Sequence, residues 1–336
     1  MFVAMCSSLL HILLILEFAC LAASRRLGVE VVAARAVAAV VLTVAGLAVG
    51  GRGFARVVSR AITLLLLYFS LPILTWYTVG IALPRFSKLV DVVVAGFTYT
   101  AVALVVVTLL ASFVGRRLGW SCRVETAATL ASVFQNALFL PLPIMLLLGG
   151  TVEPVVAYGI SFNTFVGVAV PLVASRCGVA SKSSVSRFLR VLLTFPPFYG
   201  LLAGLATMPV SWQLYAVGGY AVTLLKIVAS EVTILSFYLV GASIALAWPP
   251  RIDSAVGFIT VWRLAVSPII HVGIAMLLGL DGLLLVCILV ESFMPPATMN
   301  LVFSEYYRLE TSVVASSIAF ITPLSLALVG LLAVFR

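Results

Sequence analysis

Apolar runs of about 20 residues follow one another along almost the whole chain, and they limit the fold more than any other feature of the sequence. The hydrocarbon core of a bilayer is about 30 Å thick, and roughly 20 helical residues cross it. The separators between the runs are short, with no soluble domain and no low-complexity linker. The eleven runs lie at residues 3–23, 31–50, 61–81, 92–114, 125–149, 153–175, 188–208, 219–247, 255–279, 282–304 and 311–335. The pattern predicts an all-α polytopic membrane protein.

The scarcity of charge excludes several other classes of protein. Of the 336 residues, 63% are apolar and only 9% are charged, whereas a soluble domain carries about 25% charged residues. An ordinary cytosolic enzyme, a disordered chain and a secreted disulfide scaffold are therefore excluded. The cysteines are scattered without a Cys-x-x-Cys pair, at Cys6, Cys20, Cys122, Cys177 and Cys287. We interpret all five as unpaired, and predict neither a zinc site nor a disulfide framework.

The net charge of +9 indicates orientation in the membrane rather than binding to nucleic acid, because the cations lie in short loops between apolar runs. One set of alternate loops holds twelve cations: Arg52, Arg56, Arg60, Arg116, Arg117, Arg123, Arg176, Lys182, Arg187, Arg190, Arg251 and Arg308. The opposite set holds Arg85, Lys88 and the terminal Arg336. The positive-inside rule places the first set in the cytoplasm and the C-terminus outside. We expect a multi-pass protein of the plasma membrane.

Residues 1–30 are interpreted as an extra N-terminal hydrophobic segment. If residues 3–23 span the membrane, Arg25, Arg26 and Arg35 fall on the side with few cations. An added helix is the favoured interpretation, with a signal-type segment or an upstream start as alternatives.

The ten remaining runs divide into two halves of five helices. The first half covers residues 31–176, a basic cytoplasmic loop covers 177–187, and the second half covers 188–336. Because each half has an odd number of helices, the second half enters the membrane from the opposite side. The division predicts two inverted repeats, as found in many transporters.

Paired prolines interrupt the fourth run of each half. The first half contains QNALFLPLP, with Pro141 and Pro143, and the second contains FMPPATMN, with Pro295 and Pro296. One proline in a helix interior costs about 3 kcal/mol, so two in one span predict a broken helix. Isolated prolines elsewhere are interpreted as kinks. Matched breaks in both halves indicate the binding site of a transporter.

Two of the three asparagines, Asn136 and Asn300, flank the two breaks. An amide inside a bilayer needs a partner, and here it can cap the freed backbone, contact a ligand, or do both. The N-termini of half-helices present free N–H groups and partial positive charge, which suit a carboxylate. Gln135 could face the same cavity. The candidate substrate-binding residues are Asn136, Pro141, Pro143, Pro295, Pro296 and Asn300.

Arg263 and Glu291 are the deepest charges within the spans. A charge at the bilayer centre costs at least about 2.5–3.5 kcal/mol, which favours a functional role. The two side chains could form an ion pair, or Glu291 could carry a coupling proton because burial disfavours its charged form. The alternatives are a purely structural pair and snorkelling of Arg263 toward the cytoplasmic side.

Weaker patterns predict structural roles. Lys226 and Glu231 are expected at the outer membrane interface, and His271 is expected to be a packing residue. Gly200 and Gly204 have the Gly-x-x-x-Gly spacing that allows helices to approach closely.

The motifs FQNALFLPLP and ESFMPPATMNLVFSEYY, with RVVSRAITLLLLYFSLPIL, LVGASIALA and RLAVSPII, resemble the auxin efflux carrier family over residues 31–336. The resemblance implies two inverted five-helix repeats with crossed, proline-broken fourth and ninth helices. It also implies a scaffold domain, a mobile transport domain of the elevator kind, and organic-anion substrates. The matching site residues are Asn136, Pro143, Pro295 and Asn300.

An enzyme is not expected, because Asp91, Asp253 and Asp281 lie at run ends and the two histidines, His11 and His271, are far apart. No ATP-binding P-loop motif is present, and no cofactor is expected. The predicted function is secondary active transport of small organic anions by alternating access, driven either by a proton as the coupling ion or by the membrane potential, between which the sequence does not choose. The alternative is an ion or solute channel, or a membrane sensor, that uses the same broken helices. Expected partners are the substrate and the lipid bilayer. A second copy of the chain, in a homodimer, is a further candidate partner.

Overall fold

The computed structural model describes residues 28–50, 53–177 and 196–334. Over these ranges the chain is helical and forms no strand. Six helical stretches are long and apolar enough to cross a membrane: Val31–Val49, Phe54–Ala82, Lys88–Leu118, Pro196–Leu246, Ser254–Leu277 and Thr311–Leu331. The prediction of a helical, membrane-embedded protein is confirmed. Predictions for residues 1–27, and for all of the basic loop except Cys177, lie outside the described residues.

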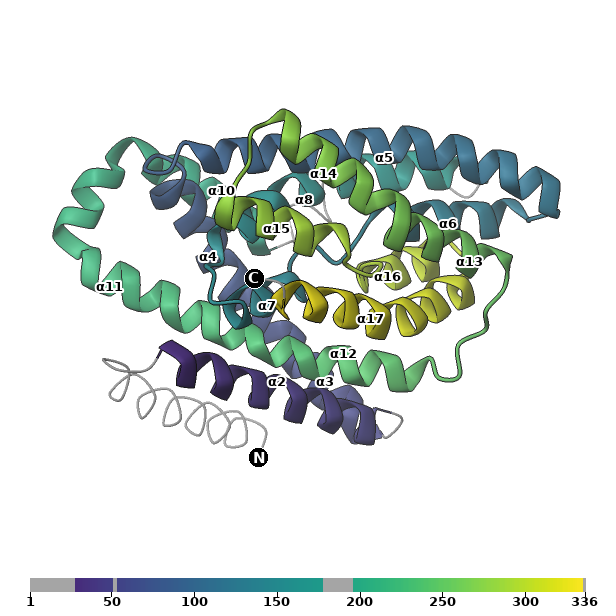
Figure 1. Cartoon of the computed structure of the whole chain (residues 1–336), viewed down its shortest axis with the longest axis horizontal. Coiled ribbons are helices and arrows are strands. Elements are labelled where there is room, and N and C mark those ends of the chain that lie inside the picture. Colours follow the sequence, from purple (N-terminus) through teal and green to yellow (C-terminus); the bar gives the residue numbers. More distant parts are fainter. Residues whose placement is uncertain (1–27, 51–52, 178–195, 335–336) are drawn as a thin grey trace.

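Most helices overlap the predicted apolar runs, although the helices that begin at Gly53 and Ser211 start eight residues before runs 61–81 and 219–247. In the first half they are α2 (Gly28–Val49), α3 (Gly53–Leu65), α4 (Leu71–Tyr77), α5 (Lys88–Leu118), α6 (Cys122–Val133), α7 (Pro141–Leu147) and α8 (Glu153–Ser175). In the second half they are α10 (Pro196–Thr207), α11 (Ser211–Val232), α12 (Ser236–Leu246), α13 (Ser254–Val261), α14 (Ser267–Leu277), α15 (Gly282–Ser292), α16 (Met299–Tyr306) and α17 (Thr311–Val334). Figure 1 shows α5 along one side of the molecule and α2 along the other, with α6, α7, α16 and α17 between them.

The isolated prolines are accommodated within helices, as the sequence predicts. Pro72 and Pro268 each follow a π-helical turn, at Leu66–Ser70 and Trp262–Val266, and the helix continues beyond them. A local change of helical pitch is a usual way to absorb a missing proline N–H. Pro171 and Pro323 lie inside α8 and α17.

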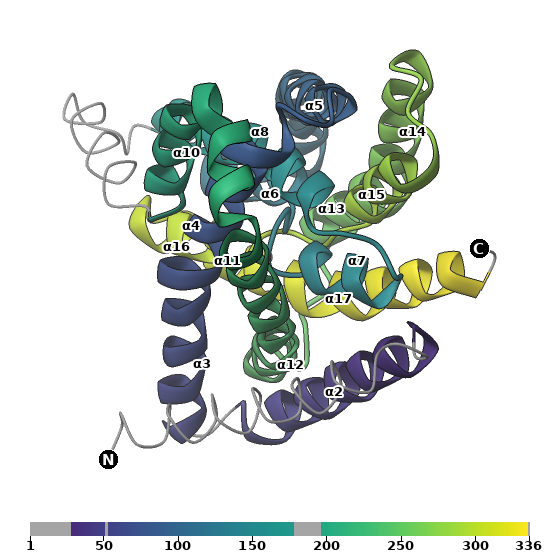
Figure 2. The same cartoon turned by 90° about the vertical axis from the view of Figure 1, so that its left-hand side faces the viewer.

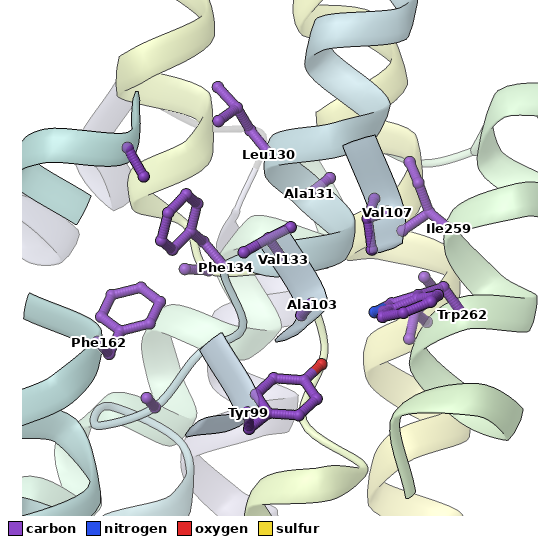
Figure 3. Packing of buried hydrophobic residues seen from close by; sticks show 14 of the residues in the cluster. Tyr99, Ala103, Val107, Leu130, Ala131, Val133, Phe134, Phe162, Ile259 and Trp262 are labelled. Carbon is purple, nitrogen blue, oxygen red and sulfur yellow. The ribbon is translucent and has the colours of Figure 1, made fainter. Parts of the chain in front are cut away.

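Two large buried apolar clusters share the helices α8, α15 and α17. One joins α5, α6, α8, α13 and α17 and includes Tyr99, Phe134 and Trp262, which Figure 3 shows among other side chains of the cluster. The other joins α2, α4, α7, α12 and α15 and includes Leu74 and Leu142. Figure 2 shows α2 and α12 at the edge opposite α5.

Glycines set the closest helix contacts. A Cβ atom at Gly200 in α10 would collide with the carbonyl oxygen of Pro72 in α4, and one at Gly241 in α12 would collide with that of Thr43 in α2. A Cβ atom at Gly204 would lie 2.7 Å from that of Val79. The close approach predicted from the Gly-x-x-x-Gly spacing is therefore confirmed.

The cysteine interpretation is wrong for two of the five residues. Cys122, at the start of α6, and Cys177, just after α8, form a disulfide, with their Cα atoms 5.7 Å apart. Cys287 is free and buried, and Cys6 and Cys20 lie outside the described residues. The pairing was missed because 55 residues separate the two cysteines, and only the packing of α6 against α8 brings them together.

Lys226 and Glu231 of α11 both form ion pairs with other helices. The Lys226 Nζ atom lies 2.7 Å from Glu153 Oε1 at the start of α8. Glu231 pairs with Arg35 of α2, whose Nε donates to Glu231 Oε2 at 3.0 Å. These partly buried pairs tie α11 to both α2 and α8.

Candidate functional site

Both runs that carry paired prolines are interrupted. The first stops at Val133 and resumes as α7 at Pro141. The second stops at Ser292 and resumes as α16 at Met299. Pro141 occupies the first position of α7. A residue at this position makes no N–H hydrogen bond within the helix, so proline is tolerated there. Pro295 and Pro296 lie in the non-helical segment of the second run.

The two non-helical segments pair with each other. Gln135 and Pro296 form an isolated antiparallel bridge. The N–H of Asn136 donates to Pro295 O at 2.8 Å, and the N–H of Ala297 donates to Phe134 O at 2.9 Å. Backbone groups released by the breaks are thus satisfied by the other break, which a lipid-embedded chain requires.

The two asparagines have different surroundings. Asn136 Oδ1 accepts a hydrogen bond from the N–H of Leu140 at 3.3 Å, and its Nδ2 has no partner among the described residues. Asn300 Nδ2 donates to Phe134 O at 2.7 Å, while its buried Oδ1 has no partner there. Asn136 therefore keeps a free donor, whereas the donor of Asn300 holds the two segments together.

The start of α7 offers fewer free amides than the sequence suggests. Pro141 and Pro143 have no N–H to donate. The N–H of Leu142 bonds to Leu138 O at 3.1 Å, and that of Ile144 bonds to Leu140 O at 3.3 Å. The expectation that both half-helices present free N–H groups is therefore not met at α7. The two prolines have no N–H, and the N–H groups of Leu142 and Ile144 already bond to carbonyls of the preceding turn.

Arg263, in the π-helical turn before α14, is completely buried. Its nitrogens donate only to neutral oxygens: Nε to Met294 O (2.8 Å), Nη1 to Tyr99 Oη (2.9 Å), Gln135 Oε1 (2.9 Å) and Ser132 O (3.5 Å), and Nη2 to Ser292 O (3.4 Å). The alternative in which Arg263 snorkels to the membrane surface is wrong, because these contacts hold the guanidinium in the protein interior.

Glu291 is also completely buried, one residue before the end of α15. It forms no ion pair within the described ranges, so the direct pair with Arg263 considered from sequence is not present. Instead Gln135 Nε2 donates to Glu291 Oε2 at 3.3 Å, while Gln135 Oε1 accepts from Arg263. Glu291 Oε1 has no partner there. Gln135 therefore separates the two charges and contacts both.

His271 belongs to the same polar network rather than serving only as a packing residue. Its Nδ1 lies 2.8 Å from Ser267 O, and since a carbonyl only accepts, we assign the ring proton to Nδ1. Nε2 then accepts from Tyr158 Oη at 2.8 Å, and Tyr158 Oη accepts from Gln135 Nε2 at 3.0 Å. The imidazole ring also lies against Tyr99, with centroids 3.7 Å apart.

Tyr99 and Tyr158 were not identified from the sequence. Both are tyrosines on buried faces of α5 and α8, and a hydroxyl buried in an apolar helix needs a polar partner. That need is a usable signal, although it does not name the partner.

The breaks thus join a polar network built from Gln135, Arg263, Glu291, Tyr158 and His271. The described residues contain no group of three or more His, Cys, Asp or Glu side chains that could hold a metal ion. No protein-family model matches the chain, and no curated protein matches its sequence. A function for this site is therefore inferred from its geometry and from the motifs quoted above.

Proposed function

We propose that the protein is a secondary active transporter of small organic anions, of the kind found in the auxin efflux carrier family. The observation that carries the proposal is the antiparallel pairing of the two interrupted segments through Gln135 and Pro296. Paired helix breaks in two halves of a membrane protein are the usual location of a transporter's substrate site.

In this proposal Asn136 contacts the substrate carboxylate through Nδ2, which has no partner among the described residues. Its Oδ1 is held by the N–H of Leu140, so the amide is oriented before a ligand arrives. Asn300, Pro295 and Pro296 fix the facing segment. A free amide donor of the kind found at Asn136 favours an anion over a cation.

The proposed architecture is two inverted five-helix repeats whose fourth and ninth helices cross at the breaks. Asn136 is 7% exposed and Asn300 is 0% exposed, so a ligand reaches them only if helices move. This closure favours alternating access over a permanently open pore.

The proposed orientation places the arginine-rich loops in the cytoplasm of a plasma-membrane protein. Glu291 is the proposed carrier of a coupling proton. Its Oε1 atom is buried without a partner in the described structure, which favours protonation of this oxygen at one stage of the cycle.

The first experiment is a thermal-shift screen of purified protein against monocarboxylates, dicarboxylates, indole acids and amino acids. A carboxylate that raises the melting temperature is then tested for uptake in reconstituted vesicles. Saturation with concentration and counterflow are expected from a carrier, whereas a channel shows neither.

The combined variant Asn136→Ala, Asn300→Ala should abolish uptake. A Gln→Ala change at Gln213, on the start of α11, serves as a control for loss of an amide elsewhere and should transport normally. Unchanged transport by the double variant would show that the substrate site lies elsewhere.

A further inference from the structure

Two helix C-termini converge on the Arg263 guanidinium. Ser132 lies in the last turn of α6 and Ser292 is the last residue of α15, and the carbonyl oxygens of both face Arg263. Carbonyls in a last helical turn lack intrahelical partners, and each helix C-terminus carries about half a negative charge. The two ends together present about one negative charge, which one guanidinium balances.

The oxygens around Arg263 are those that usually bind a monovalent metal cation in a transporter. Three are backbone carbonyls, from Ser132, Ser292 and Met294, and the others are Gln135 Oε1 and Tyr99 Oη. Carbonyls of unwound segments and half-helix C-termini coordinate coupling cations in transporters built with broken helices.

The site also has more acceptors than the guanidinium uses. Glu291 Oε1 and Ser132 Oγ are both buried and have no hydrogen-bond partner among the described residues. Each belongs to a residue at the C-terminal end of a half-helix that Arg263 contacts or adjoins. A buried oxygen without a hydrogen-bond donor costs free energy, which a bound cation can offset.

We propose that the Arg263 side chain fills a monovalent-cation site between the ends of α6 and α15, as a cation covalently attached to the protein. The wild-type protein then needs no Na⁺ at this position, and removal of the side chain opens a site that takes Na⁺ or guanidinium. The inference rests on the proposed transport function only in naming this place as a coupling-ion site. Its test measures cation binding and needs no substrate.

The test compares melting temperatures of the full chain in lipid nanodiscs with about 20 mM choline, Na⁺ or guanidinium chloride at constant ionic strength. Arg263→Ala should melt about 3–6 °C higher in Na⁺ or guanidinium than in choline, because a ligand bound only by the folded state stabilises it. Wild type should differ by less than about 1 °C among the three salts.

Trp262→Ala is the matched control, because Trp262 lies in the same π-helical turn and is equally buried but contributes no charge. It should lose stability without responding to the choice of cation. Arg263→Lys keeps the positive charge, and its melting temperature should be the same in Na⁺ and in choline. This variant is used for the test if the alanine variant cannot be purified.

Equal melting temperatures of Arg263→Ala in all three salts would overturn the proposal. So would a Na⁺-specific rise in wild type or in Arg263→Lys, since the site would then be empty although the side chain is present. A negative substrate screen would leave these cation measurements unchanged, so the two proposals fail separately.

Discussion

The side-chain amide of Asn300 donates a 2.7 Å hydrogen bond to the carbonyl oxygen of Phe134, a residue 166 positions earlier in the chain. The same carbonyl accepts the N–H of Ala297 at 2.9 Å. One backbone oxygen, released where α6 ends, therefore accepts two hydrogen bonds from the second interrupted segment. The side chain of Asn136, the counterpart in the first break, bonds only within its own segment, although its backbone N–H donates to Pro295 O.

This difference predicts that substitution of Asn300 mainly affects stability, whereas substitution of Asn136 mainly affects ligand binding. Asn300→Ala should lower the free energy of unfolding by about 1–2 kcal/mol, because it removes a buried hydrogen bond between the two breaks. Asn136→Ala should lower it less, yet abolish the thermal shift produced by a carboxylate ligand. Thermal melts of both variants, with and without that ligand, make the comparison. The reverse pattern would assign the ligand contact to Asn300.

Glu291→Gln should flatten the pH dependence of transport. A glutamine keeps the size and the contact with Gln135 but cannot exchange a proton, so any step that needs Glu291 to change charge becomes independent of pH. Initial uptake rates in vesicles between about pH 5 and 8, where folding stability is usually near its maximum, provide the measurement. Glu305→Gln, on the exposed face of α16, should keep the wild-type profile. An unaltered profile for Glu291→Gln removes this residue from proton coupling.

Gly200→Ala should destabilise the protein, whereas Gly257→Ala should not. The added methyl group at Gly200 meets the Pro72 carbonyl of α4, while at Gly257 it meets no atom within 4 Å. Overpacking of this kind costs about 1–3 kcal/mol, and alanine at an open helical position is neutral or stabilising. Melting temperatures of the two purified variants decide between these outcomes. Equal stability would show that α4 and α10 can separate freely.

The Cys122–Cys177 disulfide should contribute about 2–4 kcal/mol to stability, because it joins the start of α6 to the end of α8. Reduction should lower the melting temperature of wild type and leave that of Cys122→Ser unchanged. Peptide mapping without reductant should recover the two cysteine peptides linked. Alkylated thiols at both positions in unreduced protein would contradict the pairing.

The same mapping tests orientation in the membrane. Arg123 and Arg176 adjoin the two cysteines and belong to the loops predicted to be cytoplasmic, where disulfides are rare. Recovery of the linked peptides from freshly lysed cells, with thiols blocked during lysis, would argue against a cytoplasmic location of this end of α6. Linkage that forms only after purification agrees with the charge bias.

Helix positions were predictable because they depend on local sequence. Apolar runs long enough to span a bilayer became helices, since a chain in lipid must satisfy its backbone internally. The paired prolines marked both interruptions, because a proline removes a helical donor wherever the chain then goes. Gly200 and Gly204 likewise marked a close helix contact before its partner was known.

Contacts between distant residues were not predictable in this way. Arg263 and Glu291 were recognised as buried charges, but their separation by Gln135, and the acceptors around Arg263, depend on where α6, α13 and α15 meet. Tyr99, Tyr158 and the Cys122–Cys177 pair were missed for the same reason. The sequence by itself determined a helical membrane protein with two interrupted spans, because hydropathy and proline chemistry act over a few residues. Only the tertiary structure decided which released backbone groups pair and which oxygens surround Arg263, because those contacts join residues 29 to 166 positions apart.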